Sequence, residues 1–154
     1  MTRGSVRGFR PSYLRNARRR ANLSHEDLGL LASVSPSTIG HWESSRRAPS
    51  PEALMAVAQS LNMVVADLAP VAEGDLLLSD LRNRMGLTQA AAAAAIGISH
   101  QALGSIERGA RPPTVEIREK IATVYGSDSG QVGRIWQRTH DARVVRPDPR
   151  PPLH

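Results

Sequence analysis

The stretch that decides the fold runs from Leu23 to Glu43 and reads LSHEDLGLLASVSPSTIGHWE. A second stretch of the same length, from Leu87 to Glu107, reads LTQAAAAAAIGISHQALGSIE. Both belong to a longer repeat, because residues 14–62 set over residues 78–126 without a gap give eleven identical pairs out of 49. A period of 64 residues is longer than that of stacked solenoid repeats. The sequence therefore predicts two copies of one small domain, each of about 60 residues and able to fold alone.

Local signals predict a series of helices in each copy. Ser24 is a preferred N-cap, and Ser35-Pro36 combines a cap with a proline in the first turn. The expected helices of the first copy span 11–21, 24–33, 36–43, 52–61 and 65–71, and the second copy repeats this order with a last short helix at 131–137. In the second of these helices, Leu28, Leu31 and Ala32 have the spacing of an inward face. Because aromatic residues make up only 3% of the chain, aliphatic cores between packed helices are expected.

About twenty residues in each copy match a helix-turn-helix. Such a unit needs apolar residues where its helices cross, a small residue at the closest approach and a turn residue that tolerates positive φ. Gly29 and Ala93 are the small residues, and Gly97 is the turn residue of the second copy. The first copy has Ser33 at the turn, where slight strain is expected. The apolar positions are Leu28, Ala32, Val34, Ile39 and Trp42, and Ala92, Ile96, Ile98, Leu103 and Ile106.

On these residues the chain resembles the lambda Cro/C1-like (XRE-type) helix-turn-helix transcription factors. The resemblance covers about residues 14–69 and 78–136. It implies an all-α protein with two tandem five-helix lambda-repressor-like DNA-binding domains, the third helix of each lying in the major groove. It also implies two structural ion pairs, Arg18 with Glu43 and Arg82 with Glu107. The first copy departs from the family where His25 replaces the usual glutamine, which the second copy keeps as Gln89.

The expected organisation has five parts. Residues 1–10 form a flexible basic arm, residues 11–70 the first domain, and residues 71–75 a linker. Residues 76–138 form the second domain, and residues 139–154 a disordered basic tail rich in proline and arginine.

Charge is distributed unevenly between the two copies. The chain carries +6, of which residues 1–69 contribute +4, residues 70–136 zero and residues 137–154 +2. A basic surface attracts the DNA backbone. The copy that resembles the family more closely is thus the electrically neutral one, so the motif and the charge favour different copies.

Candidate DNA contacts follow from the expected position of each recognition helix. Base edges are read by the exposed first turns of that helix, and phosphates are bound by the polar groups and arginines around it. Gln101 is the strongest base reader, because an amide can bond N6 and N7 of adenine together. The base-reading candidates are Pro36, Ser37, Thr38, Gly40 and His41, and His100, Gln101 and Ser105. The phosphate candidates are His25, Ser35, Arg46, Arg47, Gln89, Ser99, Arg108 and Arg111.

These features predict a sequence-specific transcriptional regulator, acting as a repressor, whose two linked heads read unlike half-sites of double-stranded DNA. A second interpretation leaves DNA binding to the first copy. The second copy would then be a dimerisation or partner-binding module, as in antitoxin-type regulators. The polar reader Gln101 favours the first interpretation, and the zero net charge of the second copy favours the other.

Other functional classes find little support in the sequence. No paired carboxylates, phosphate-binding glycine loop or catalytic triad can be placed, so neither an enzyme nor a cofactor is expected. The absence of cysteine excludes thiolate metal sites, and the histidine spacing indicates no other metal site. No apolar run is long enough to span a membrane, and no membrane partner is expected. We expect a cytoplasmic protein of a bacterium or phage, associated with the nucleoid.

Overall fold

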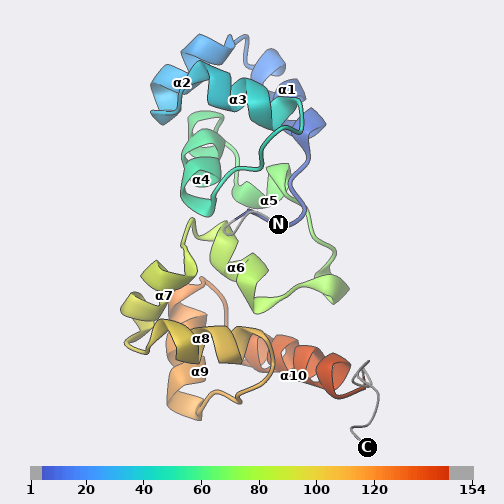
Figure 1. Ribbon diagram of the computed structural model, residues 1–154, viewed down its shortest axis with the longest axis vertical. Coiled ribbons are helices and arrows are strands. Elements are labelled where there is room, and N and C mark those ends of the chain that lie inside the picture. The colour runs from blue at the N-terminus through green and yellow to red at the C-terminus, as the bar shows by residue number, and fades with distance from the viewer. Residues whose placement is uncertain (1–4, 146–154) are drawn as a thin grey trace, which may run out of the picture.

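The computed structural model describes residues 5–145, which form two helical bundles stacked along the long axis of the molecule (Figure 1). This part of the chain contains ten α-helices, one short 3-10 helix and no strand, so the predicted all-α class is confirmed. The first bundle contains α1 (Pro11–Arg20), α2 (His25–Ala32), α3 (Pro36–Glu43), α4 (Pro51–Ser60) and α5 (Val65–Leu68). The second contains α6 (Leu78–Arg84), α7 (Gln89–Ile96), α8 (His100–Glu107), α9 (Val115–Val124) and α10 (Ser129–Val145). We call residues 5–69 the first head and residues 76–145 the second head.

The helix starts follow the capping residues. Ser24 accepts a hydrogen bond from the backbone N–H of Asp27, whose carboxylate in turn accepts one from the N–H of Ser24. Ser35 and Ser50 cap α3 and α4 by accepting from the N–H of Thr38 and of Ala53, without the return bond, and a proline follows each of them. A cap of this kind stabilises a helix by about 1 kcal/mol, because it satisfies a backbone donor that has no partner within the helix.

Each head has its own apolar core. The largest fully buried side chains of the first head include Leu14, Leu28, Ile39 and Leu54. Those of the second head include Leu78, Leu103, Ile106 and Ile121. Leu31, expected to face inward, is 60% exposed, because α2 turns Leu28, Gly29 and Ala32 toward the core instead.

The geometry of the turn between α2 and α3 explains why small residues occupy positions 29 and 33. A Cβ atom on Gly29 would lie 2.4 Å from the carbonyl oxygen of Val34, so only glycine fits this crossing. Ser33 ends α2 in the left-handed conformation, with φ 57° and ψ 41°. Gly97 ends α7 with φ 88° and ψ 30°. The two turns have the same form, but only the second uses the residue type that adopts it without steric cost.

Replacing Ser33 with glycine should therefore stabilise the first head by about 1 kcal/mol, because the left-handed conformation penalises any residue with a Cβ. The gain is reduced by the greater freedom of glycine in the unfolded chain. Urea denaturation of the full chain measures the change. Gly97→Ser is the matched reverse substitution and should destabilise the second head by a similar amount. An unchanged midpoint for Ser33→Gly would contradict the strain expected at this turn.

The two heads pack directly against each other where α6 contacts α4 and α5. A Cβ atom on Gly86, after α6, would lie 2.5 Å from the sulfur of Met55 in α4, so the heads approach closely at this point. Arg7 also joins the heads, because its Nη1 lies 2.9 Å from Oδ2 of Asp80, whose side chain is only 3% exposed. Burial raises the pKa of Asp80, while the N–H of Leu77 and the charge of Arg7 act in the opposite direction.

The segment expected to be a flexible arm is docked where the structure describes it. Val6 is 5% exposed and donates its N–H to the carbonyl of Pro49, and the N–H of Arg10 donates to Leu68. The expectation of a flexible arm is therefore wrong for residues 5–10. Glycine and arginine suggested mobility there, but Val6 supplies an apolar anchor and the exposed Arg7 pairs with the buried Asp80. Residues 1–4 lie outside the described residues.

The last helix is longer than predicted. The expected tail began at residue 139, but α10 continues to Val145. The ring of His140 stacks on Trp136 with centroids 4.9 Å apart, and its Nδ1 lies 2.8 Å from the carbonyl oxygen of Gly109. Arg138 donates to the carbonyl of Leu76 at 2.6 Å. These contacts hold α10 against the rest of the second head. The prediction of a disordered tail is therefore wrong for residues 139–145. Residues 146–154, the remainder of the expected tail, lie outside the described residues.

Candidate nucleic-acid interface

The first recognition helix, α3, is anchored by its apolar side and presents polar residues outside. Ile39 and Trp42 are 0% and 4% exposed, so they fix the rotation of the helix on the core. Ser35 Oγ accepts from the N–H of Thr38 at 3.2 Å and lies 2.6 Å from the hydroxyl of Thr38. Of the base-reading candidates, Pro36 and Ser37 are exposed, whereas Thr38, Gly40 and His41 are partly buried.

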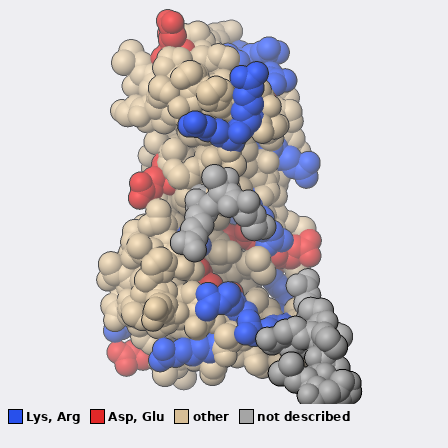
Figure 2. All heavy atoms as spheres, in the orientation of Figure 1, with Lys and Arg blue, Asp and Glu red and all other residues tan. Residues whose placement is uncertain are grey.

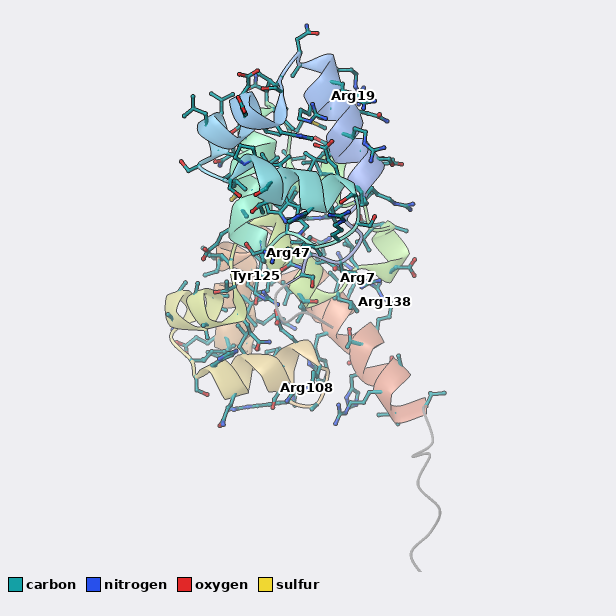
Figure 3. All side chains as sticks on the ribbon, turned by 45° about the horizontal axis from the view of Figure 1, so that its top comes forward. Arg7, Arg19, Arg47, Arg108, Tyr125 and Arg138 are labelled. Carbon is teal, nitrogen blue, oxygen red and sulfur yellow. The ribbon has the colours of Figure 1, made fainter. Side chains whose placement is uncertain are left out.

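The second recognition helix, α8, is built in the same way. Leu103 and Ile106 are buried, and Ser99 Oγ accepts from the N–H of Ala102 at 3.0 Å. His100 and Gln101 are exposed and Ser105 is partly buried. Figures 1 and 3 show α3 and α8 on the same side of the molecule.

A buried ion pair fixes the end of α3 to α1. Nε and Nη2 of Arg18 each donate to a carboxylate oxygen of Glu43 at 2.8 Å, and the two side chains are 11% and 5% exposed. His25 Nε2 lies 3.2 Å from the same carboxylate. Burial alone would raise the pKa of Glu43, but the hydrogen bonds and charge of Arg18, together with the nearby His25 ring, lower it below its ordinary value. Nη1 of Arg18 also donates to the carbonyl of Leu23, which links the start of α2 to this pair.

The second head has the equivalent pair with additional partners. Nε of Arg82 lies 3.0 Å from Glu107, and its Nη1 donates to the carbonyl of Leu87, the position equivalent to Leu23. Gln89 and Tyr125 also donate to the Glu107 carboxylate, each at 2.9 Å. Burial and the neighbouring carboxylate raise the pKa of Tyr125, so its phenol keeps the donated proton. Tyr125 was missed from the sequence, because the first head has Leu61 at the same position.

Three of the predicted contact residues are held by these networks. His25 lies against Glu43, and Gln89 bonds Glu107 through its amide nitrogen. The amide oxygen of Gln89 lies 2.7 Å from Nε2 of His100 at the start of α8. The networks thus tie the first residues of α2, α7 and α8 to the buried ion pairs. Contact of His25 and Gln89 with phosphate, and of His100 with a base, stays a prediction.

The arginines predicted to contact phosphate lie in matching loops after the recognition helices. The N–H groups of Arg46 and Arg47 donate to the carbonyl of His41, and the N–H of Arg111 donates to that of Ser105. These three arginines and Arg108 are exposed. On the face shown in Figure 2, Lys and Arg atoms lie over the first head and again over the second.

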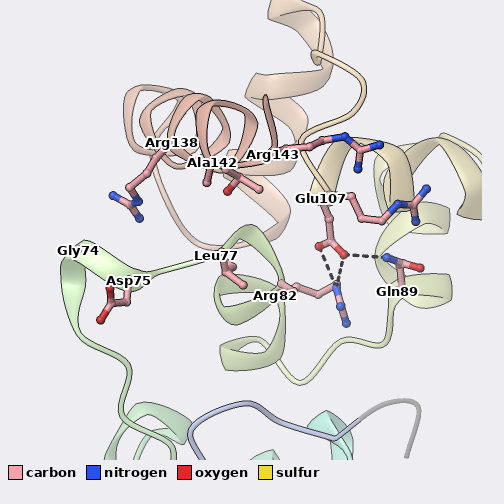
Figure 4. A pocket seen from close by; sticks show the side chains of 12 residues that line it. Gly74, Asp75, Leu77, Arg82, Gln89, Glu107, Arg138, Ala142 and Arg143 are labelled. Carbon is pink, nitrogen blue, oxygen red and sulfur yellow. Dashed lines mark hydrogen bonds and ion pairs between the residues drawn. The ribbon is translucent and has the colours of Figure 1, made fainter. Parts of the chain in front are cut away.

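A cleft of about 880 Å³ opens between α6, the end of α8 and α10 (Figure 4). Arginines dominate its charged lining: Arg82, Arg108, Arg138 and Arg143. Arg138 and Arg143 were missed as candidates, because the sequence placed Arg138 after the last expected helix of the second domain and Arg143 in the tail. Their spacing from Trp136 and His140 along one helix is the signal that could have placed them.

The zero charge of the second copy conceals an uneven distribution. Asp80 is buried against Arg7, which belongs to the first head, so its charge does not offset the arginines of the second head. Glu107 and Arg82 are both largely buried and neutralise each other. The 3-10 helix Glu73–Asp75 places Asp75 at the cleft. In contrast, Glu116 and Glu119 line a separate groove between α7 and α9, together with Lys120. The surface around α8 is therefore more basic than the net charge of the copy indicates.

Two bundles with anchored recognition helices and polar first turns define a DNA-binding helix-turn-helix protein. The sequence model of the Helix-turn-helix family matches the chain twice, at residues 14–64 and 78–131. The chain therefore belongs to the Cro/C1-type (XRE) helix-turn-helix family, with two tandem domains, and is a DNA-binding transcriptional regulator. No curated protein and no solved structure matches it. Among residues 5–145, no helix has the length and apolar character needed to cross a membrane.

Proposed function

We propose that both heads bind DNA and read two unlike half-sites through the first turns of α3 and α8, so that the chain acts as a repressor. The observation that carries this proposal is the position of the two recognition helices on one side of the molecule (Figures 1 and 3). Both are fixed by a buried Arg–Glu pair and both begin at a serine cap. Repression is the expected outcome, because two heads on adjacent half-sites exclude other proteins from that DNA.

The half-sites are expected to differ because the exposed readers differ. The first head exposes Pro36 and Ser37, with His41 partly buried beside them, and the second exposes His100 and Gln101. Arg108 and Arg111 lie beside α8 as Arg46 and Arg47 lie beside α3, which supports phosphate contacts by both heads. The exposed arginines of the second head favour this function over the alternative, in which that head binds only a protein partner or a second copy.

Replacing Gln101 with alanine should weaken binding by about 1–3 kcal/mol and relax the preference at one base position, because the amide can bond adenine at two atoms. Selection of bound DNA from a random pool gives the preferred site, and titration of that site with each variant gives the affinity. Gln59→Ala removes an exposed glutamine from α4 and is the matched control, with no change expected. If Gln101→Ala behaves like this control, the second head does not read bases and the alternative function is favoured.

A further inference from the structure

We infer that the two heads bind the operator in the same orientation, so that their two unlike half-sites are read in the same direction along the DNA. This inference rests on the proposed function, because it requires both heads to read bases. It concerns the relative orientation of the half-sites, which neither the family nor the identity of the readers decides.

The two heads are related by a shift along the long axis. In Figure 1, α3 and α8 both lie across this axis and both run from left to right. The preceding helices, α2 and α7, lie to the left in each head, and the following helices, α4 and α9, run along the axis. In the tilted view of Figure 3, α3 and α8 keep the same common direction. A two-fold axis that exchanged the heads on this face would reverse one of the two recognition helices, which is not what is seen.

Contacts between the heads fix this arrangement. The ion pair of Arg7 with Asp80 and the close approach of Gly86 to Met55 both lie between the heads. The connecting segment is short, and its 3-10 helix Glu73–Asp75 is closed by a 2.8 Å hydrogen bond from the N–H of Asp75 to the carbonyl of Ala72. The chain therefore leaves little freedom for the second head to turn around relative to the first.

The DNA must match this geometry. Symmetric dimers of helix-turn-helix proteins read palindromes, because their two-fold axis reverses the second recognition helix. Two recognition helices that run in the same direction instead have the same orientation relative to the 5′–3′ direction of one DNA strand. Because the major groove crosses the duplex obliquely, a duplex parallel to the long axis brings α3 and α8 to successive turns of the groove. We therefore expect half-sites about 10 base pairs apart, since that spacing returns the groove to the same face.

The test uses the full chain and the site obtained by selection from random DNA. Three duplexes are compared: the selected site, the same site with the second half-site inverted in place, and the same site with five base pairs inserted between the half-sites. We expect the inverted and the lengthened duplexes to bind at least about tenfold more weakly, because the second head loses its base contacts in both. A duplex with a scrambled second half-site gives the affinity expected for one head.

Gln101→Ala is the matched control, because it weakens reading by the second head and should reduce the penalty of inversion. Equal binding of the inverted duplex would show that the second head is not held in one orientation, and it would overturn the inference. Orientation is measured by cleavage of the selected site from a reagent attached to a single cysteine at Ala48 or at Pro112, which are exposed and equivalent positions in the loops after α3 and α8. Cleavage displaced to the same side of both half-sites is expected, and displacement to opposite sides would overturn the inference while leaving the proposed function intact. Selection of a single half-site, with no contribution from Gln101, would instead show that the proposed function fails and the inference with it.

Discussion

Replacing Glu43 with alanine should unfold the first head under conditions in which the second remains folded. The substitution leaves the guanidinium of Arg18, 11% exposed, without the carboxylate that accepts two of its hydrogen bonds. Removing one partner of a buried ion pair costs about 3–5 kcal/mol, because the other charge stays desolvated. The total stability of a domain of about 60 residues is roughly 3–9 kcal/mol, so this loss removes much or all of it.

The two tryptophans allow the heads to be followed separately. Trp42 belongs to the core of the first head and Trp136 to that of the second, and the chain has no other tryptophan. Thermal unfolding of single-tryptophan variants, with the other replaced by phenylalanine, should show an early transition only for Trp42 in the Glu43→Ala background.

The second head provides a matched comparison. Glu107→Ala should reverse the pattern, because Arg82, Gln89 and Tyr125 lose their common acceptor. Glu52→Ala, which removes an exposed carboxylate from the first turn of α4, should cost less than about 1 kcal/mol. If Glu43→Ala cost no more than Glu52→Ala, the ion pair would not be what holds α1 to α3.

The helix starts and the crossing of the two motif helices could be predicted because their causes are local. Ser35 followed by Pro36 determines where α3 begins, whatever packs on it. Gly29 and Ala93 mark the same crossing in both copies, and the structure explains the glycine by the 2.4 Å approach of the Val34 carbonyl. The resemblance to the helix-turn-helix family also implied the two Arg–Glu pairs, which the structure contains.

Features that depend on distant partners could not be predicted. Arg7 looks like part of a mobile arm until Asp80, 73 residues away, is placed beside it. In the same way, α10 extends past residue 139 because His140 meets Gly109 of the loop after α8. The exposure of Leu31 on α2 was also predicted wrongly. Its spacing fits an inward face, and only the packing of α2 on the core shows that the Leu31 side chain is exposed. The charge of a copy likewise says little about the charge around α8, since Asp80 is paired with Arg7 of the first head and Glu116 and Glu119 lie in a separate groove.

DNA binding should weaken about 150-fold between 50 and 200 mM salt. Each arginine that neutralises a phosphate releases counterions and contributes about −0.9 to the slope of log K against log salt. The four arginines beside the recognition helices, Arg46, Arg47, Arg108 and Arg111, are exposed and would give a slope of about −3.6 together. Titration of one operator at several salt concentrations measures this slope, and Arg138 and Arg143 in the cleft would make it steeper.

The slope of log K against log salt also decides between the two functions, because an arginine removed from one head changes the slope only if that head contacts phosphates. Arg47→Ala and Arg111→Ala occupy equivalent positions, and each should reduce the slope by about 1 if both heads lie on DNA. Lys120→Ala is the control, since Lys120 lies 3.3 Å from Glu116 in the separate groove between α7 and α9. A slope of about −2 that changes with Arg47 but not with Arg111 would assign the phosphates to the first head alone. The second head would then be the partner-binding module, and its basic cleft would have to serve a different acidic ligand.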